Sequence, residues 1–224
     1  MFLLLFQTAI LIYIILMVYH LLDLQKYNYH GILIRASNKD EINIQRKNLN
    51  PILFQNEESL IMQDEHINIG FNDEYIPFSQ YLSDKDNQIY IYKNKELFLA
   101  LGLKSNHFDL SFLNDYDQLC VIENSISVFK NLNSTLYKCS HNYNIIGILD
   151  GESTFYLFNP KHKKDIFNKS NQEIKKWGHK HVLQKGNLLF IPTNWYYIQE
   201  TQGKVIQYHI TADSYFTFIP NFFK

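Results

Sequence analysis

The sequence of 224 residues predicts a mainly β domain of the barrel or jelly-roll class with short flanking helices, preceded by one N-terminal transmembrane helix. Three observations lead to this prediction. The first 22 residues carry no charged side chain. The later part of the chain holds short apolar runs separated by turn residues, a pattern typical of many short strands. Aromatic residues make up 16% of the chain, and Phe and Tyr favour strands.

The composition excludes several classes of protein. Hydrophobic residues are 46% and charged residues 19% of the chain, which excludes general disorder. A net charge of −1 argues against a nucleic-acid-binding protein, so we expect no nucleic-acid partner. Two cysteines are too few for a disulfide framework or a Cys-rich zinc site.

Residues 1–22 are predicted to form an uncleaved membrane anchor in contact with lipid. The run is almost wholly apolar and the first charged residue is Asp23, while a helix needs about 20 such residues to span the hydrocarbon. A cleaved signal peptide would have a basic start and a small-residue cleavage site, and the sequence has neither. A buried core helix is the other alternative, because Gln7 and Thr8 are polar.

The charges after the anchor predict its orientation. Lys26, Arg35 and Lys39 follow the apolar run, and the positive-inside tendency then places the main domain in the cytosol. Residues 133–135 and 168–170 match the glycosylation triplet, which would favour the opposite side. Such triplets arise by chance in an Asn-rich chain, so we expect a single-pass membrane protein with a cytosolic domain.

The first part of the soluble chain, residues 23–74, is expected to be a connector with the first strand. It is polar apart from the apolar run 31–34, where we place that strand. Residues 96–101 read as a short helix that ends at Gly102. The main domain is expected over residues 75–224.

Strands follow from the apolar runs of the second half. They are expected at residues 119–122, 125–129, 144–149, 154–158, 188–191 and 205–211. Asp150-Gly151 stands between two of these runs and predicts a β-hairpin.

The segment from Lys161 to Lys185 is strongly basic. It carries eight lysines against Asp165 and Glu173. We favour a solvated loop; the alternative is a surface that faces anionic lipid headgroups, which attract lysines close to a membrane.

Four segments, in order along the chain, carry a resemblance to a known family. They are residues 75–82 with 89–92, 134–139, 144–160 and 186–197. From residue 75 onward the chain resembles a JmjC/cupin-like domain of the Fe(II)/2-oxoglutarate oxygenase superfamily. The resemblance implies a double-stranded β-helix, the cupin or jelly-roll fold.

The resemblance also implies where an iron site would lie. The family holds ferrous iron with two His and one carboxylate, and the matching positions here are Tyr137, Cys139 and Tyr197. The family's lysine for the 2-oxoglutarate carboxylate falls at Ser153 or Thr154. These five positions therefore read as a degenerate site, and we expect no metal and no cofactor.

Two further site positions, Asn144 and Trp195, match the family's site surroundings. Other ligands remain conceivable: Cys139 would suit zinc, His141 lies two residues on, and His179 and His181 have the spacing of one strand face. A one-residue error in register would instead turn Tyr137 and Tyr197 outward.

The sequence thus predicts a membrane-anchored, catalytically inactive pseudo-oxygenase with a binding or structural role and an unidentified protein partner. One alternative is an oxygenase or other metalloenzyme with substituted ligands. Another is an oligomeric membrane scaffold.

Overall fold

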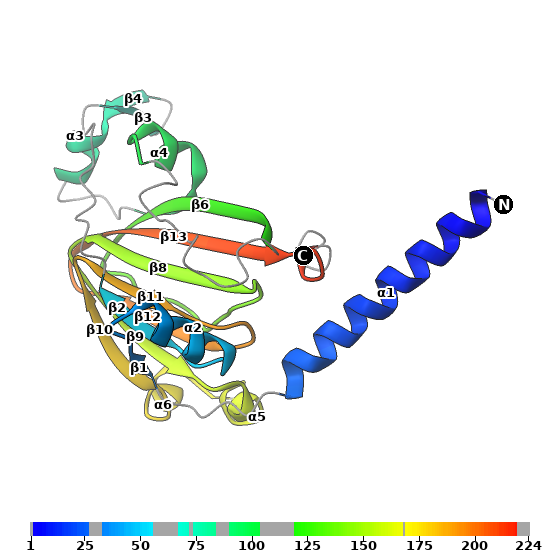
Figure 1. Ribbon diagram of the computed structural model, residues 1–224. Helices are drawn as coiled ribbons and strands as arrows, with labels where there is room; N and C mark the ends of the chain where they lie inside the picture. Colours follow the sequence, from blue (N-terminus) through cyan, green and yellow to red (C-terminus); the bar gives the residue numbers. More distant parts are fainter. Residues whose placement is uncertain are drawn as a thin grey trace.

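The structure is a computed structural model that describes residues 2–26, 33–55, 67–71, 74–83, 90–103, 119–167 and 169–218. Two facing β-sheets form the main body, and the helix α1 (Phe2–Lys26) projects from one side of it (Figure 1). The prediction of a mainly β fold is confirmed.

The larger sheet has seven strands in the order β1-β2-β11-β8-β13-β6-β5. Their bounds are β1 (Ile34–Arg35), β2 (Ile52–Gln55), β11 (Asn187–Phe190), β8 (Tyr143–Asp150), β13 (Lys204–Ser214), β6 (Leu119–Lys130) and β5 (Tyr90–Asn94). β1 runs parallel to β2, and the other neighbours are antiparallel. The sheet is therefore mixed, and strands from residues 23–74 extend one edge of it.

The smaller sheet has four antiparallel strands in the order β10-β9-β12-β7. They are β10 (His179–Gln184), β9 (Glu152–Phe158), β12 (Tyr196–Thr201) and β7 (Tyr137–Lys138). A separate antiparallel pair joins β3 (Asn68–Phe71) to β4 (Glu74–Pro77).

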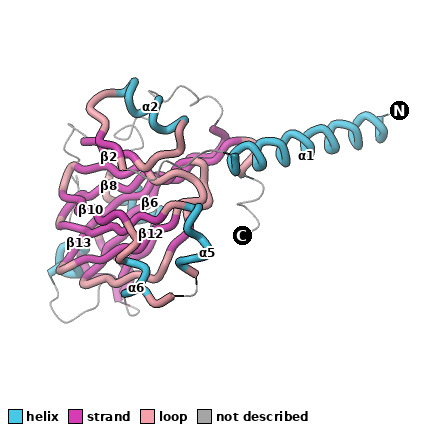
Figure 2. Tube along the Cα trace, turned by 90° about the horizontal axis from the view of Figure 1, so that it is seen from below, coloured by secondary structure: helices cyan, strands magenta, loops and turns pink. Residues whose placement is uncertain are grey.

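Short helices cover the outer faces of both sheets. They are α2 (Lys39–Lys47), α3 (Phe78–Ser83), α4 (Lys95–Ala100), the 3-10 turn η3 (Pro160–His162), α5 (Lys163–Ile166) and α6 (Asn171–Lys175). Phe78 of α3 and Phe98 of α4 pack on one face of the larger sheet. Ile166 and Ile174, from α5 and α6, pack on the outer face of the smaller sheet. Figure 2 shows α2 and α6 on opposite sides of the sandwich.

β8 explains why the larger sheet is central. Every residue from Tyr143 to Leu149 is buried, because β8 pairs on both edges and is covered on both faces. Gly147 is required there: a Cβ at this position would lie 2.1 Å from the ring of Tyr208. The absence of a side chain makes room for that buried phenol.

The predicted strands and helix fall close to the observed ones. The runs 119–122 and 125–129 form one strand, β6, and the helix expected at 96–101 is α4, followed by Gly102 at φ +68°. β2, β10, β12 and α2 were not predicted.

The hairpin predicted at Asp150-Gly151 is wrong. Gly151 makes a tight turn at φ +83°, but β8 pairs with β11 and β13, whereas β9 pairs with β10 and β12. Gly186 and Gly203 likewise lie between strands of different sheets. A turn sequence such as Asp-Gly is the same in two cases: the strand after the turn can pair with the strand before it, or it can belong to the facing sheet.

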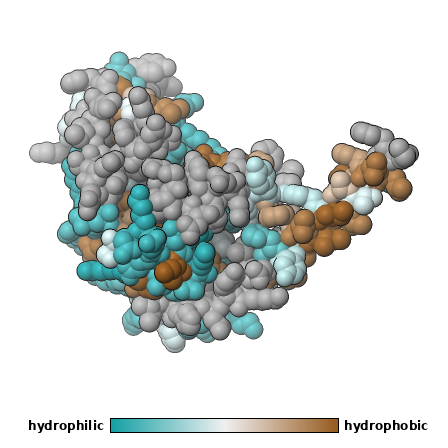
Figure 3. Space-filling model, in the orientation of Figure 1, coloured by the Kyte–Doolittle hydropathy of each residue, from teal (hydrophilic) through white to brown (hydrophobic). Residues whose placement is uncertain are grey.

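α1 is long and apolar enough to cross a membrane, a property that signal sequences share. The candidate span is Leu3–His20, and none of it is buried. Figure 3 shows this helix as an apolar rod outside the main body. It contacts the C-terminal turn: the Tyr13 hydroxyl donates to the carbonyl of Tyr215, and the ring of Phe216 lies 6.1 Å from that of Tyr13.

Candidate functional site

Aromatic side chains from four strands, β5, β7, β9 and β12, contact one another. Tyr137 on β7 lies directly opposite Tyr197 on β12, with ring centroids 5.4 Å apart. Tyr92 of β5 stacks on Tyr137 at 6.1 Å, and Phe155 lies 5.9 Å from Tyr197. We call Tyr92, Tyr137, Phe155 and Tyr197 the aromatic cluster.

Residues 137–139 alternate as a strand requires. Tyr137 packs against the buried cluster that contains Cys139 and Tyr197, whereas Lys138 is exposed. Tyr137 and Cys139 therefore point to the same interior. The structure brings together Tyr137, Cys139 and Tyr197, the three residues that the resemblance led us to expect at one site.

Cys139 is an unreactive thiol in this setting. Its side chain is 3% exposed, and burial raises the pKa of the thiol to about 12. Its backbone is fixed by Trp195, whose carbonyl accepts from the Cys139 N–H at 2.8 Å, and by Asn194, whose N–H donates to the Cys139 carbonyl at 2.8 Å. At neutral pH the sulfur is protonated and is a poor metal ligand.

A chain of buried polar side chains runs beside the aromatic cluster. The Gln199 amide donates to Ser153 Oγ at 2.8 Å and to Gln207 Oε1 at 2.7 Å. The Gln207 amide lies 3.0 Å from His209 Nε2, and Ser127 Oγ lies 3.0 Å from the same nitrogen. We call these five residues the polar ladder.

The polar ladder fixes the protonation of His209. Ser127 Oγ accepts the backbone N–H of Lys93 at 2.9 Å, which leaves its own hydrogen for His209 Nε2. Because the Gln207 amide donates to the same nitrogen, we assign Nε2 as an acceptor and place the proton on Nδ1. Burial, with a smaller effect of Lys93, lowers the pKa of His209 to about 3, so the imidazole is neutral at pH 7.

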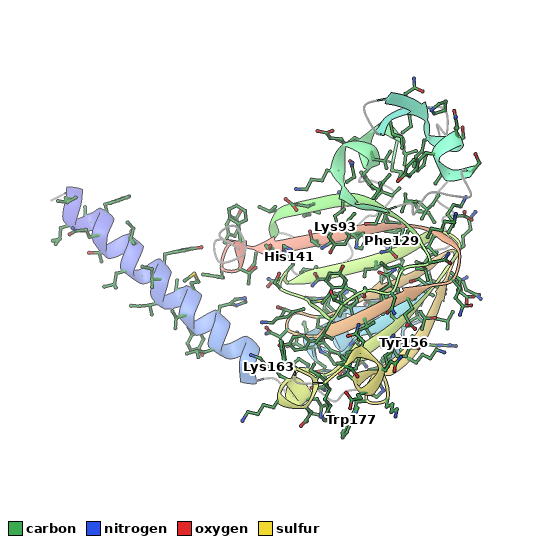
Figure 4. The ribbon with its side chains drawn as sticks, turned by 180° about the vertical axis from the view of Figure 1, so that it is seen from behind. Lys93, Phe129, His141, Tyr156, Lys163 and Trp177 are labelled. Atoms are coloured by element: carbon green, nitrogen blue, oxygen red, sulfur yellow. The ribbon has the colours of Figure 1, made fainter. Side chains whose placement is uncertain are left out.

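Lys93 brings a cation to the edge of this interior. Burial lowers the pKa of its amine, against the opposing effects of Cys139 and Glu123. Its Nζ lies 5.5 Å from the ring centroid of Tyr92. Figure 4 shows Lys93 beside Phe129, close to β6. Burial likewise raises the pKa of the Tyr197 phenol well above its usual value.

Sequence reasoning named Ser153 but missed the other four residues of the polar ladder and Lys93. Alternate residues of a strand point to the same face. Gln199 therefore points inward with Tyr197 on β12, and Gln207 and His209 point inward with Val205 on β13. Polar residues at inward positions of otherwise apolar strands could have indicated the polar ladder. This signal was not used for Gln199, because the strand β12 was not predicted.

Ser153 and Thr154 lie on opposite faces of β9. Ser153 is buried within the polar ladder, whereas Thr154 is half-buried on the outer face, opposite Val182 of β10. Of the two, only Ser153 therefore reaches the interior between the sheets.

Asn144 and Trp195 hold backbone together. The Asn144 amide donates to the carbonyls of His141 and Ile191 at 3.0 and 3.3 Å. The wholly buried Trp195 donates from Nε1 to the carbonyl of Leu49 at 3.0 Å. Both side chains satisfy buried polar groups between segments distant in sequence.

The three histidines considered as alternative metal ligands, His141, His179 and His181, lie outside the aromatic cluster. His141 Nδ1 lies 2.7 Å from Asp213 Oδ2, on the side of the sandwich that faces α1 (Figure 4). His179 and His181 pair with Leu157 and Phe155 along β10. Among the residues that the structure describes, no three His, Cys, Asp or Glu side chains gather as a metal site.

The basic segment is not a loop, which corrects that expectation. It forms η3, α5, α6 and β10, and β10 pairs with β9 over six residues. The sequence did not predict the 3-10 turn η3 or the edge strand β10, because a high density of lysines is typical of solvent-exposed loops.

No family model and no curated protein matches this sequence. Similar solved structures are cupin-superfamily proteins. A cupin superfamily protein from Desulfitobacterium hafniense is 14% identical with a TM-score of 0.31, over 42% of this chain and 68% of the other. The Cnp3 cupin domain of Schizosaccharomyces pombe is 14% identical with a TM-score of 0.32, over 42% and 53%.

The similar structures also include an enzyme. A mutant salicylate 1,2-dioxygenase from Pseudoaminobacter salicylatoxidans, in complex with gentisate, is 6% identical with a TM-score of 0.30, over 40% of this chain and 20% of the enzyme. The chain thus spans from 20% to 68% of these three proteins. This likeness concerns a cupin-like β-sandwich and carries no argument about activity.

Proposed function

We propose that this chain is a single-pass membrane protein with a cytosolic JmjC/cupin-like domain, a double-stranded β-helix that has lost the family's iron chemistry. Its role is to bind a partner or to act as a scaffold. The observation that carries the proposal is the convergence of Tyr137, Cys139 and Tyr197 on one interior.

The three side chains fill the space where an iron site would need room and charge. The rings of Tyr137 and Tyr197 pack against each other at 5.4 Å, and Cys139 belongs to the same buried cluster. Burial raises the pKa of both Cys139 and Tyr197, so neither supplies an anion at neutral pH. A ferrous ion taken from water into this interior would lack a compensating negative charge.

The membrane anchor is supported by the exposure of α1. Large apolar side chains of its candidate span, Leu3–His20, are exposed, and the domain contacts this span where Tyr215 and Phe216 meet Tyr13. A bilayer removes that surface from water, and 18 helical residues extend about 27 Å, close to the thickness of the hydrocarbon.

The test is metal and cosubstrate chemistry of the full chain in detergent micelles. After anaerobic loading with ferrous iron and 2-oxoglutarate, we expect no stoichiometric retention of iron. When oxygen, the oxidant that the decarboxylation of 2-oxoglutarate requires, is then admitted, we expect no carbon dioxide release above buffer. Stoichiometric iron together with turnover of 2-oxoglutarate overturns the proposal.

The substituted-ligand metalloenzyme makes a different prediction. It requires that Cys139→Ser or His141→Asn releases a bound metal, while the matched control Cys120→Ser retains it. The scaffold alternative is separated by the mass of the detergent-solubilised protein, since it requires a defined oligomer.

A further inference from the structure

Two large apolar side chains are exposed where the chain leaves the smaller sheet. Phe167 follows α5 and Trp177 follows α6, and each is 57% exposed. Figure 4 shows Trp177 at the outer surface, beyond the helices that cover the sheet. Ile166 and Ile174 bury the inner faces of the two helices. The ring of Phe167 meets the buried Tyr196 edge-on, with ring centroids 5.5 Å apart, and leaves its other side exposed.

Lysines surround both rings. Lys163 Nζ lies 5.9 Å from the ring centroid of Phe167, and Lys169 Nζ lies 4.7 Å from that of Trp177. Lys161, Lys164, Lys176 and Lys180 are exposed in the same segment. We call the surface formed by these six lysines, Phe167 and Trp177 the α5–α6 face.

The α5–α6 face is held in a fixed shape. Ser170 and Glu173 form a capping box at the start of α6, with the Ser170 N–H donating to Glu173 Oε2 at 2.9 Å. Phe158, Tyr196 and Ile198 of the smaller sheet form the platform under the helices. The exposed rings are therefore presented by an ordered support.

We propose that the α5–α6 face rests on the anionic surface of the membrane in which α1 is anchored. The inference deepens the proposed function and rests on its membrane anchor. Lysines are attracted to anionic headgroups, and the indole of Trp177 suits the interface between headgroups and acyl chains. Lysine stems can bury their methylenes there while the amines stay in water.

The anchor keeps this face within reach of lipid. Only seven Cα–Cα steps separate Lys26 of α1 from Leu33 of the domain, and such a length of chain spans at most about 25 Å. Figures 1 and 2 both place α5 near the Lys26 end of α1. Such a short connection gives the domain a high local concentration at the bilayer. A modest attraction between the α5–α6 face and the headgroups is then enough to hold this face on the membrane.

A membrane fits the α5–α6 face better than a nucleic acid. Lys169 lies over one face of the Trp177 ring, which leaves less of the ring open for stacking on a base.

The experiment measures quenching of Trp177 by acrylamide in the full chain, reconstituted in nanodiscs. The chain has two tryptophans; Trp195 is wholly buried, and subtraction of a Trp177→Phe variant isolates Trp177. We expect protection of Trp177 in nanodiscs that contain phosphatidylserine, little protection in pure phosphatidylcholine, and loss of protection in high salt.

A charge variant tests the mechanism. Lys163→Gln with Lys169→Gln should weaken surface contact by about 25-fold, about five-fold for each lysine. The matched control, Lys39→Gln with Lys47→Gln, removes two lysines from α2 on the opposite side of the sandwich (Figure 2) and should leave Trp177 protected. Equal quenching in both lipids, or protection by single-stranded RNA and not by phosphatidylserine, overturns the proposal.

Failure of the anchor would be seen separately. An alkaline wash of the membranes releases the full chain if α1 does not span the bilayer, and this contradicts the proposed function. Quenching of Trp177 reports the α5–α6 face independently, because it is compared between lipids in the same reconstituted particles.

Discussion

The two faces of the smaller sheet carry similar residue types in opposite settings. On the inner face Tyr197 and Cys139 are buried, Tyr137 packs half-buried against them, and Lys93 lies at the edge of the same interior. On the outer side, Trp177 and the lysines of the α5–α6 face are open to water. Burial keeps the Cys139 thiol and the Tyr197 phenol neutral, whereas exposure leaves the outer lysines free to attract a charged surface.

The largest effect should be seen in the reactivity of Cys139. With a pKa of about 12, the native thiol should react with iodoacetamide at pH 8 roughly a thousand-fold more slowly than in the unfolded chain. A Cys120→Ser background leaves Cys139 as the single thiol to report. Equal rates in the native and unfolded chain would mean that the interior is open to water.

Trp195→Ala should lower the free energy of unfolding by about 3–5 kcal/mol, since it removes a wholly buried indole and its bond to Leu49. Denaturant titration monitored by circular dichroism measures this change. Trp177→Ala is the matched control, and an exposed position should change the free energy by less than about 0.5 kcal/mol. Similar losses in the two variants would contradict the contrast between the two faces.

His209 should make the domain less stable in mild acid. Its pKa is about 3 when folded and about 6.5 when unfolded. The unfolded state therefore binds the extra proton first, and stability that is complete above pH 6.5 falls as the pH drops toward 3. Between pH 7 and pH 5 we expect a loss of about 2 kcal/mol from this residue.

The control for that loss is His209→Gln, which keeps hydrogen-bonding capacity but does not titrate. Denaturant titrations at both pH values should show a flatter dependence in the variant. If the two proteins lose stability equally between pH 7 and pH 5, His209 is not the buried neutral group described here.

The smallest effect concerns the α5–α6 face. Lys163→Gln with Lys169→Gln should change the free energy of unfolding in detergent by less than about 0.5 kcal/mol, because exposed charges contribute little to folding. Calorimetric unfolding of the variant and the parent chain checks this. A large destabilisation would show that these lysines serve the fold and not a surface.

Sequence patterns predicted the elements whose signals are local. The apolar runs predicted β8, β9 and β13, and Gly102 predicted the end of α4. Both signals depend only on residues that are neighbours in the chain: the spacing of apolar residues and the glycine that follows a helix. The sheet to which each strand belongs could not be read from Asp150-Gly151, since a tight turn also serves a crossing between sheets.

The candidate site was predicted in part. The resemblance led to Tyr137, Cys139 and Tyr197, which the structure brings together. It did not lead to Gln207 and His209. Their hydrogen bonds join β13 to β12 and β6, and no single position in the sequence shows which strands will be neighbours.

The central claim is that neutral, packed side chains occupy the position of a former iron site. Electron paramagnetic resonance of the full chain with ferrous iron and nitric oxide tests it most directly, since an open protein-bound ferrous site gives an iron–nitrosyl signal. We predict a spectrum indistinguishable from that of iron and nitric oxide in buffer. A stoichiometric protein-bound signal that disappears in Tyr137→Ala or Cys139→Ala would contradict the account.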